Sequence, residues 1–462
     1  MNTKNKYLLA ITGLLLVINV AAQKEIPPAG GTPKNFNLPE KKSKKLLNGL
    51  RTTMVQYGSV PKVSISLVIN TGSVHDAPNE TGLADLTGRL MGQGSVSMDF
   101  ATLSKKVAGM GGTVNVSVGK EEVYITGSVL SEFAPDFIAA IADLVIHPGF
   151  PPAELERLKD DMKRELTVSK TVPQEIAQAA FRKKIFGDHP YGKLYSTEEQ
   201  INSFSVQKVK DFYNKNFGAK RSSLYLAGKF DEAKVNVAID KAFGKWKAGP
   251  DITNPVVTAV AKGDTLIIDR KASAQTTIML GLLTVKPKDK DFIPVSITNS
   301  LLGGSFGSRI TSNIRENKGY TYSPFSTVLN RRSASVWYEQ ADVTSEHTVA
   351  SLQEIEKEIR RLQNQPPSVE ELKGIQNYEA GIFVLQNSNP DGIIGQLQFI
   401  DKYNLPDNYL STRVKNMYSV TPQMVSEMTR KYFDPAKMTV VMVGDQKAIN
   451  EQINKAAPKK AF

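Results

Sequence analysis

The sequence predicts an α+β fold built from two homologous repeats, each a mixed, mainly antiparallel sheet packed with helices. The same helix-then-strand pattern occurs twice, far apart in the chain, and strands and helices both recur within each copy. The 462 residues, 40% hydrophobic and 23% charged, have the composition of an ordinary folded protein and suffice for roughly two to four domains.

The duplication is visible in two segments that align without gaps, 206–217 and 422–433. Both have an amphipathic helical pattern, and each leads into an apolar strand that ends in glycine, at Gly228 and Gly444. Identical residues share an offset of 216: Gln207/Gln423, Val209/Val425, Lys215/Lys431, Phe217/Phe433 and Gly228/Gly444. A second pair, 152–159 and 366–373, agrees at an offset of 214. Two matches in the same order indicate duplication.

The domain boundaries follow from breaks in these patterns. Gly249, Pro250 and Pro255 interrupt the chain between the copies. We therefore predict an N-terminal domain over 37–246, a linker over 247–262 and a C-terminal domain over 263–462. In the N-terminal domain, β-branched residues predict strands within 63–70 and 113–129, and helical periods predict helices near 80–92, 101–109, 132–145, 152–169 and 205–216.

The N-terminus has the three-part layout of a secretory signal. Lys4 and Lys6 precede an apolar run over 7–20, and small residues follow up to Ala22. We predict a signal peptide over 1–22 and a flexible leader over 23–36. A membrane anchor is the alternative, but the run is shorter than the ~20 residues that span a bilayer. We expect an exported protein without stable membrane insertion, located in the bacterial periplasm.

Composition excludes several functions. The chain has no cysteine, which rules out disulfides, thiolate–zinc sites and cysteine nucleophiles. Its formal charge of +12 gives a general attraction for polyanions. The sequence nevertheless has no compact basic run and no RNA-binding signature, so we expect no nucleic-acid partner.

One segment carries a recognisable chemical pattern, Gly82-Leu-Ala-Asp85-Leu-Thr-Gly88-Arg89-Leu-Met91. It resembles the segment in which the pitrilysin/insulinase family of zinc peptidases carries its inverted zinc motif, His-x-x-Glu-His. The resemblance places Asp85 and Arg89 at the two histidine positions and Gly88 at the general-base position. The family's third ligand, a glutamate on a later helix, matches Glu165. A loop over 186–192, followed by Ser196-Thr-Glu, also matches the family in order.

The residues at these positions cannot perform the family's chemistry. Hydrolytic zinc needs three protein ligands and a glutamate that takes a proton from the bound water. Arg89 places a permanent cation where the metal would sit, and Gly88 cannot accept a proton. We expect no metal and no catalytic residue in this chain. We also expect Glu165 on the buried side of its helix, with Arg89 replacing zinc as its counter-charge and Asp85 joining them; the alternative is that Glu165 reaches solvent.

The C-terminal repeat retains a second family pattern. A glycine-rich turn over 301–309 leads to Arg315-Glu-Asn-Lys-Gly-Tyr-Thr-Tyr322, and the resemblance implies that Arg315 and Tyr322 hold substrate and stabilise the transition state. A guanidinium can grip a peptide carbonyl or carboxylate, and a phenol can donate to an oxyanion. The alternatives are a surface salt bridge of Arg315 with Glu316 or Glu370, and a Tyr322 packed in the core. The turn lacks the form of a phosphate-binding loop.

The family has heteromeric members in which one chain supplies zinc and another supplies the Arg/Tyr pair. The resemblance therefore implies a non-catalytic, substrate-binding subunit of an exported heteromeric zinc endopeptidase, inactive alone. Its partner would be a catalytic subunit of the same family, with the intact motif and its zinc, and a peptide would be cleaved in the closed chamber between them. The alternative is a peptide-binding or scaffold protein on the same fold, with no enzymatic role.

Overall fold

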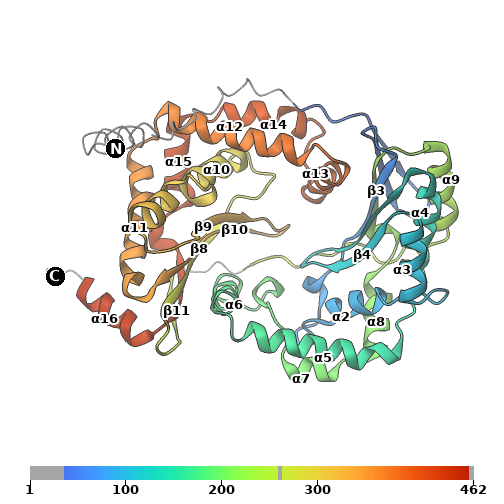
Figure 1. Cartoon of the computed structure of the whole chain (residues 1–462), viewed down its shortest axis with the longest axis horizontal. Coiled ribbons are helices and arrows are strands. Elements are labelled where there is room, and N and C mark those ends of the chain that lie inside the picture. Colours follow the sequence, from blue (N-terminus) through green and yellow to red (C-terminus); the bar gives the residue numbers. More distant parts are fainter. Residues whose placement is uncertain (1–35, 259–262, 457–462) are drawn as a thin grey trace, which may run out of the picture. The chain divides into compact units, whose positions relative to one another are not determined.

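The computed structural model describes residues 36–258 and 263–456. The predicted signal peptide, the leader up to residue 35 and the last four residues of the predicted linker lie outside this part. These described residues belong to one compact unit. It contains two mixed sheets with helices packed against them, which confirms the predicted α+β class (Figure 1). The exact domain boundaries stay predictions.

The first sheet has the strand order β1-β2-β6-β3-β5-β4. β2 and β6 are parallel, and every other neighbouring pair is antiparallel. All seven residues of β6 are buried, as expected for a central strand covered on both faces. The strands are β1 (Lys41–Lys45), β2 (Arg51–Gln56), β3 (Lys62–Ile69), β4 (Thr113–Val118), β5 (Val123–Leu130) and β6 (Ser222–Gly228).

The second sheet repeats this topology in the order β7-β11-β8-β10-β9. β7 and β11 are parallel and the other pairs antiparallel, so β11 takes the place that β6 has in the first sheet. The strands are β7 (Thr265–Asp269), β8 (Gln275–Thr284), β9 (Phe325–Leu329), β10 (Ser335–Thr344) and β11 (Thr439–Gly444). The two glycine-ended segments aligned in sequence are thus equivalent in structure, and the duplication is confirmed.

Helices of the N-terminal repeat begin at recognisable caps, for example Asp99, Ser205 and Asp231, whose side chains accept backbone N–H bonds. The predicted strand over 113–129 is a hairpin of β4 and β5, and the helix predicted from residue 80 begins at Leu83. The helices are α2 (Leu83–Met91), α3 (Phe100–Gly109), α4 (Ala134–Ile146), α5 (Pro152–Ser169), α6 (Pro173–Phe186), α7 (Glu198–Ser203), α8 (Val206–Asn216) and α9 (Glu232–Phe243).

The C-terminal repeat differs locally in two ways. Pro152 begins α5, whereas its match Pro366 lies three residues before α12. Two π-helical turns lie at the glycine-rich turn: Ser300–Gly304 includes its first residues, and Thr311–Asn317 follows it. The helices are α10 (Phe292–Asn299), α11 (Thr348–Asn364), α12 (Val369–Gln386), α13 (Pro390–Tyr403), α14 (Tyr409–Tyr418), α15 (Pro422–Tyr432) and α16 (Gln446–Ala456).

Each sheet has its own hydrophobic core. In the first, Leu67 and Phe137 are fully buried between β3, β5 and α4. In the second, Trp337 and Phe433 meet edge to face with ring centroids 5.0 Å apart. Two further buried clusters join the repeats, because α6 packs against β8 and β11 and α13 packs against β3 and β6.

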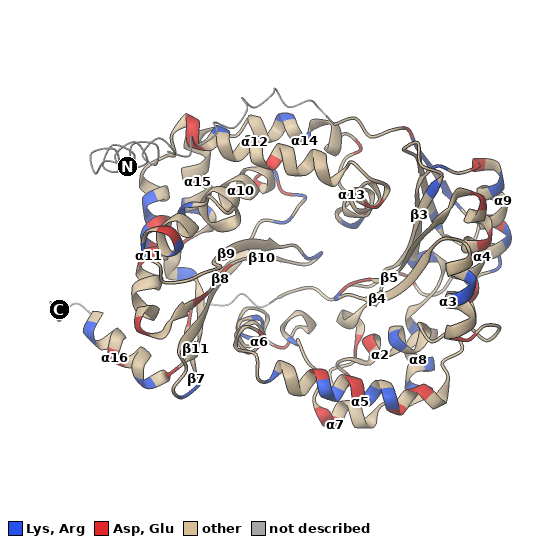
Figure 2. Ribbon diagram, in the orientation of Figure 1, with Lys and Arg blue, Asp and Glu red and all other residues tan. Residues whose placement is uncertain are grey.

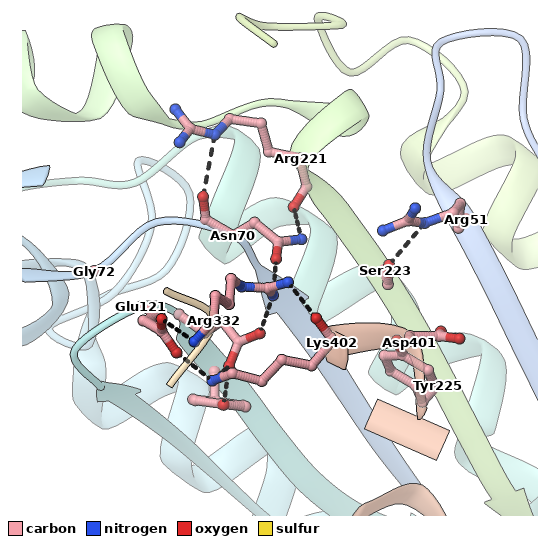
Figure 3. Close-up of polar contacts among 12 residues, drawn as sticks. Arg51, Asn70, Gly72, Glu121, Arg221, Ser223, Tyr225, Arg332, Asp401 and Lys402 are labelled. Carbon is pink, nitrogen blue, oxygen red and sulfur yellow. Dashed lines mark hydrogen bonds and ion pairs between the residues drawn. The ribbon is translucent and has the colours of Figure 1, made fainter. Parts of the chain in front are cut away.

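A buried set of charges connects the two repeats, and we call it the interdomain network: Glu121, Glu122, Arg332 and Lys402. Glu121 and Glu122 lie in the turn between β4 and β5, Arg332 lies between β9 and β10, and Lys402 is in α13. Figure 3 shows Glu121 beside Arg332 and Lys402. The ammonium of Lys402 is 2.8 Å from Glu121 Oε2 and 2.6 Å from Glu122 Oε2. Arg332 Nη2 is 2.5 Å from Glu122 Oε1. Two carboxylates therefore face two cations.

Hydrogen bonds complete this network. The backbone N–H of Arg332 donates to Glu121 Oε1 at 2.8 Å, and the hydroxyl of Tyr124 donates to Glu122 Oε2 at 2.6 Å. Glu121 and Glu122 are only 2% and 4% exposed. Burial alone would raise the pKa of Glu121, but the charge of Lys402 and its hydrogen bonds outweigh burial and hold the pKa below its ordinary value.

Replacement of Lys402 by methionine is predicted to lower the free energy of unfolding by about 3 kcal/mol, because it leaves two buried carboxylates with one cation. Urea unfolding followed by circular dichroism measures this. The matched control is Lys41→Met, which removes an exposed ion pair with Asp407 that also joins the two repeats. Equal, small effects of both substitutions would contradict the importance of the network.

Candidate functional site

The helix that carries the altered zinc motif, α2, is held at its N-terminus by Asp76. The two carboxylate oxygens of Asp76 accept the backbone N–H groups of Gly82, at 2.8 Å, and Ala84, at 2.9 Å. Gly82 has φ +97°, a conformation that favours glycine. Burial raises the pKa of Asp76 to about 7, although both N–H groups oppose the shift. This capping fixes where the motif residues project from α2.

Three of the four predicted zinc-site positions come together as an ion triad: Asp85, Arg89 and Glu165. Arg89 Nε donates to Asp85 Oδ2 at 2.7 Å, one helical turn away. Its two terminal nitrogens donate to Glu165 on α5, Nη1 to Oε1 at 2.9 Å and Nη2 to Oε2 at 2.7 Å. This is the bidentate guanidinium–carboxylate geometry. Bonding to Glu165 raises the pKa of Arg89 further above its ordinary value.

The expectation that Glu165 lies on the buried side of α5 is wrong. Its side chain is 58% exposed, whereas Leu158, Met162 and Leu166 form the buried stripe. The side chain of Glu165 projects from α5 at the edge of that stripe and binds Arg89 there. Both earlier alternatives therefore apply in part, because Glu165 is open to solvent and paired with Arg89.

The general-base position has no room for a side chain. A Cβ built on Gly88 would lie 2.2 Å from Cγ2 of Val118 in β4. Arg89 already occupies both carboxylates that could ligate a cation. In the described residues, no group of three or more His, Cys, Asp or Glu side chains is placed to hold a metal ion. The residues of this site do not fit catalytic zinc.

Replacement of Arg89 by alanine is predicted to destabilise the protein by about 2 kcal/mol, because it leaves Asp85 and Glu165 as neighbouring like charges. Thermal unfolding measures the change. Arg157→Ala is the control, because the ion pairs of this arginine with Glu154 and Asp161 on the same helix are exposed. Figure 2 shows charges of both signs along α5. An unchanged midpoint for Arg89→Ala would show that the triad contributes nothing to stability.

Replacement of Gly88 by alanine is predicted to cost about 2 kcal/mol of stability through overpacking against Val118. The double variant Gly88→Ala/Val118→Ala should recover part of that loss, because the second change removes the clashing methyl group. Chemical denaturation of the four proteins of this cycle gives the coupling energy. Purely additive effects on the free energy of unfolding would show that Val118 does not exclude a side chain at position 88.

The second candidate site is a contact of the Arg315 guanidinium with two exposed aromatic rings, although the side chain of Arg315 itself is only 23% exposed. The guanidinium carbon of Arg315 lies 4.4 Å from the ring centroid of Phe306 and 5.1 Å from that of Tyr322. Tyr322 is 80% exposed and Phe306 70% exposed. Tyr322 is therefore not a core residue. The surface salt bridge considered for Arg315 is present, with Nε 3.3 Å from Glu316 Oε1.

Sequence reasoning missed two residues beside the glycine-rich turn. Phe306 contacts the guanidinium of Arg315. The only sequence signal for its exposure is its position between Ser305 and Gly307. Glu339 in β10 is fully buried, and within the described residues neither of its carboxylate oxygens has a hydrogen-bond partner. A Cβ on Gly303 would lie 2.5 Å from Glu339 Oε2. Burial holds the pKa of Glu339 well above its ordinary value, so it packs under the turn as an uncharged acid.

The duplicated α+β architecture with an ion triad at the metal position defines a class, namely metallopeptidase-type proteins that lack the zinc chemistry. Comparison with known families agrees. Residues 52–197 match the family described as Insulinase (Peptidase family M16), and residues 203–378 match the description Peptidase M16 inactive domain. The chain belongs to this family.

Individual relatives are distant. The chain is 24% identical to an uncharacterized zinc protease, YmxG, of Bacillus subtilis over 342 residues, which is 71% of this chain and 81% of that protein. It is 21% identical over 395 residues to a Helicobacter pylori protein described as a non-peptidase homolog, covering 84% of this chain and 90% of that one.

Solved structures show the same fold. The crystal structure of a peptidase M16 inactive domain from Pseudomonas fluorescens superposes with a TM-score of 0.83 at 23% identity, covering 88% of this chain and 98% of that one. A protease from Helicobacter pylori gives a TM-score of 0.80 at 16% identity, with 88% and 100% covered.

Proposed function

We propose that this chain is the non-catalytic, substrate-binding subunit of an exported heteromeric zinc endopeptidase. A partner of the same family, with an intact His-x-x-Glu-His motif, would hold the zinc. This chain would present Arg315 and Tyr322 to an extended peptide at the partner's zinc site. By itself it would hydrolyse nothing.

The proposal rests on the difference between the altered zinc motif and the site of Arg315 and Tyr322. In the N-terminal repeat, Arg89 pairs with both remaining acids and Val118 fills the space beside Gly88. In the C-terminal repeat, Tyr322 is exposed and does not pack in the core, and the partly exposed Arg315 lies beside it. A guanidinium in this position suits a contact with a peptide carbonyl or carboxylate.

Export rests on the N-terminal signal pattern and remains a proposal. In the described part of the chain, no helix is both long and apolar enough to cross a membrane. A tagged chain recovered from the periplasmic fraction of its own cells, with mass spectrometry of what co-purifies, tests location and partner together. A stoichiometric companion with His-x-x-Glu-His supports the proposal. Recovery of the chain alone, or with non-peptidase proteins, would favour the scaffold role.

Replacement of Arg315 by alanine is predicted to lower kcat/KM of the assembled complex on a fluorogenic peptide by about a hundredfold, as loss of one transition-state donor does. Assembly, followed by size-exclusion chromatography, should be unchanged. Arg360→Ala serves as control, because this exposed arginine of α11 only pairs with Glu356. Unchanged turnover with Arg315→Ala would refute the substrate role of this residue.

A further inference from the structure

The C-terminal repeat contains a cavity of about 440 Å³ beside the glycine-rich turn, which contributes Gly304 to its wall. It lies among α10, β9, α12, α13 and α14, and its volume is in the range of small-molecule sites. Three phenylalanine rings form part of the wall, and polar side chains form most of the rest. The aromatic residues are Phe292, Phe383 and Phe399.

Two opposite charges line this cavity without pairing to each other. Glu379 projects from α12 and Arg413 from α14, and within the described residues neither belongs to an ion pair. Glu379 Oε1 accepts only the hydroxyl of Ser300. Arg413 donates to the hydroxyl of Tyr409, and its Nε is buried with no acceptor in the same part of the chain. The guanidinium carbon of Arg413 also lies 5.4 Å from the ring centroids of Phe383 and Tyr409. Both charged side chains are only half-buried, which leaves them open to a ligand.

The amide of Asn299 adds a donor with a fixed direction. Trp337 Nε1, which can only donate, and the hydroxyl of Ser326 both bind Asn299 Oδ1 at 2.7 Å. The NH₂ group must therefore point the other way, where a Cβ on Gly304 would come within 2.4 Å of Nδ2. Asn299 and Gly304 both line the cavity, and this NH₂ group has no partner among the described residues.

We propose that this cavity binds a zwitterion of amino-acid or dipeptide size. Its carboxylate would bind Arg413 and the NH₂ group of Asn299, its ammonium would bind Glu379, and its side chains would pack on the phenylalanine rings. The opposite charges select a ligand with both ends free over a simple anion or cation. This site is separate from Arg315 and Tyr322, and its existence does not depend on the proposed peptidase role.

Isothermal titration calorimetry on the full mature chain tests the proposal with four probes: leucine, dileucine, N-acetyl-dileucine and dileucine amide. We expect one of the two free zwitterions to bind, and each blocked end to weaken dileucine binding roughly tenfold or more, because a blocked end leaves a site charge unpaired. Binding of leucine but not dileucine would fix the ligand as a free amino acid, and the reverse would fix it as a short peptide.

Variants of Glu379 and Arg413 test which residue binds each charged end of the ligand. Glu379→Gln should abolish the preference for a free amine while retaining the preference for a free carboxylate, and Arg413→Met should do the opposite. Glu370→Gln, an exposed change on the same helix, should bind as the unmodified chain does. If Arg413→Met fails to fold, the blocked probes and the Glu379→Gln variant still test the proposal. No binding of either zwitterion, or binding indifferent to blocking and to Glu379→Gln, would overturn the proposal.

Discussion

The interdomain network is the constraint on which the relation of the two repeats depends. Each repeat has its own core, but Glu121 and Glu122 of the first are buried against Lys402 and Arg332 of the second. Neither pair of charges could be buried without the other, because an unpaired buried ion costs several kcal/mol. The network acts together with the apolar contacts of α6 with the second sheet and of α13 with the first, and all of them favour the same arrangement of the repeats. Charges of this kind contribute specificity more than net stability, since burial offsets much of their attraction.

The same turn connects this network to the altered zinc site. β4 carries Val118, which closes the space beside Gly88, and four residues later Glu122 enters the interdomain network. Loss of the metal site is thus part of the packing of the N-terminal repeat. Arg89 binds both remaining acids with a permanent charge, where a zinc ion would require neutral or anionic ligands. A return to zinc chemistry would require changes in strand packing as well as in the motif.

The two repeats share a strand order but present different chemistry. In the first, Arg89 pairs with both acids of the altered motif. In the second, the partly exposed Arg315 contacts Phe306 and Tyr322, and Glu379 and Arg413 line a cavity without an ion pair among the described residues. A duplicated scaffold can diverge in this way because the sheet positions the loops, and the loops determine function.

The sequence by itself determined the duplication, the α+β class, the family and the loss of zinc chemistry, because periodicity, glycine ends and residue types are local properties of the chain. The pairing of Arg89 with Glu165 followed from the family resemblance, whereas the other close approaches between distant residues were decided by the tertiary structure. Glu165 was expected to be buried but extends to solvent, since helical periodicity locates a face only to within about one side chain. Val118 lies beside Gly88, and Glu379 and Arg413 line one cavity, only because folding brings separate elements together, which no single segment encodes.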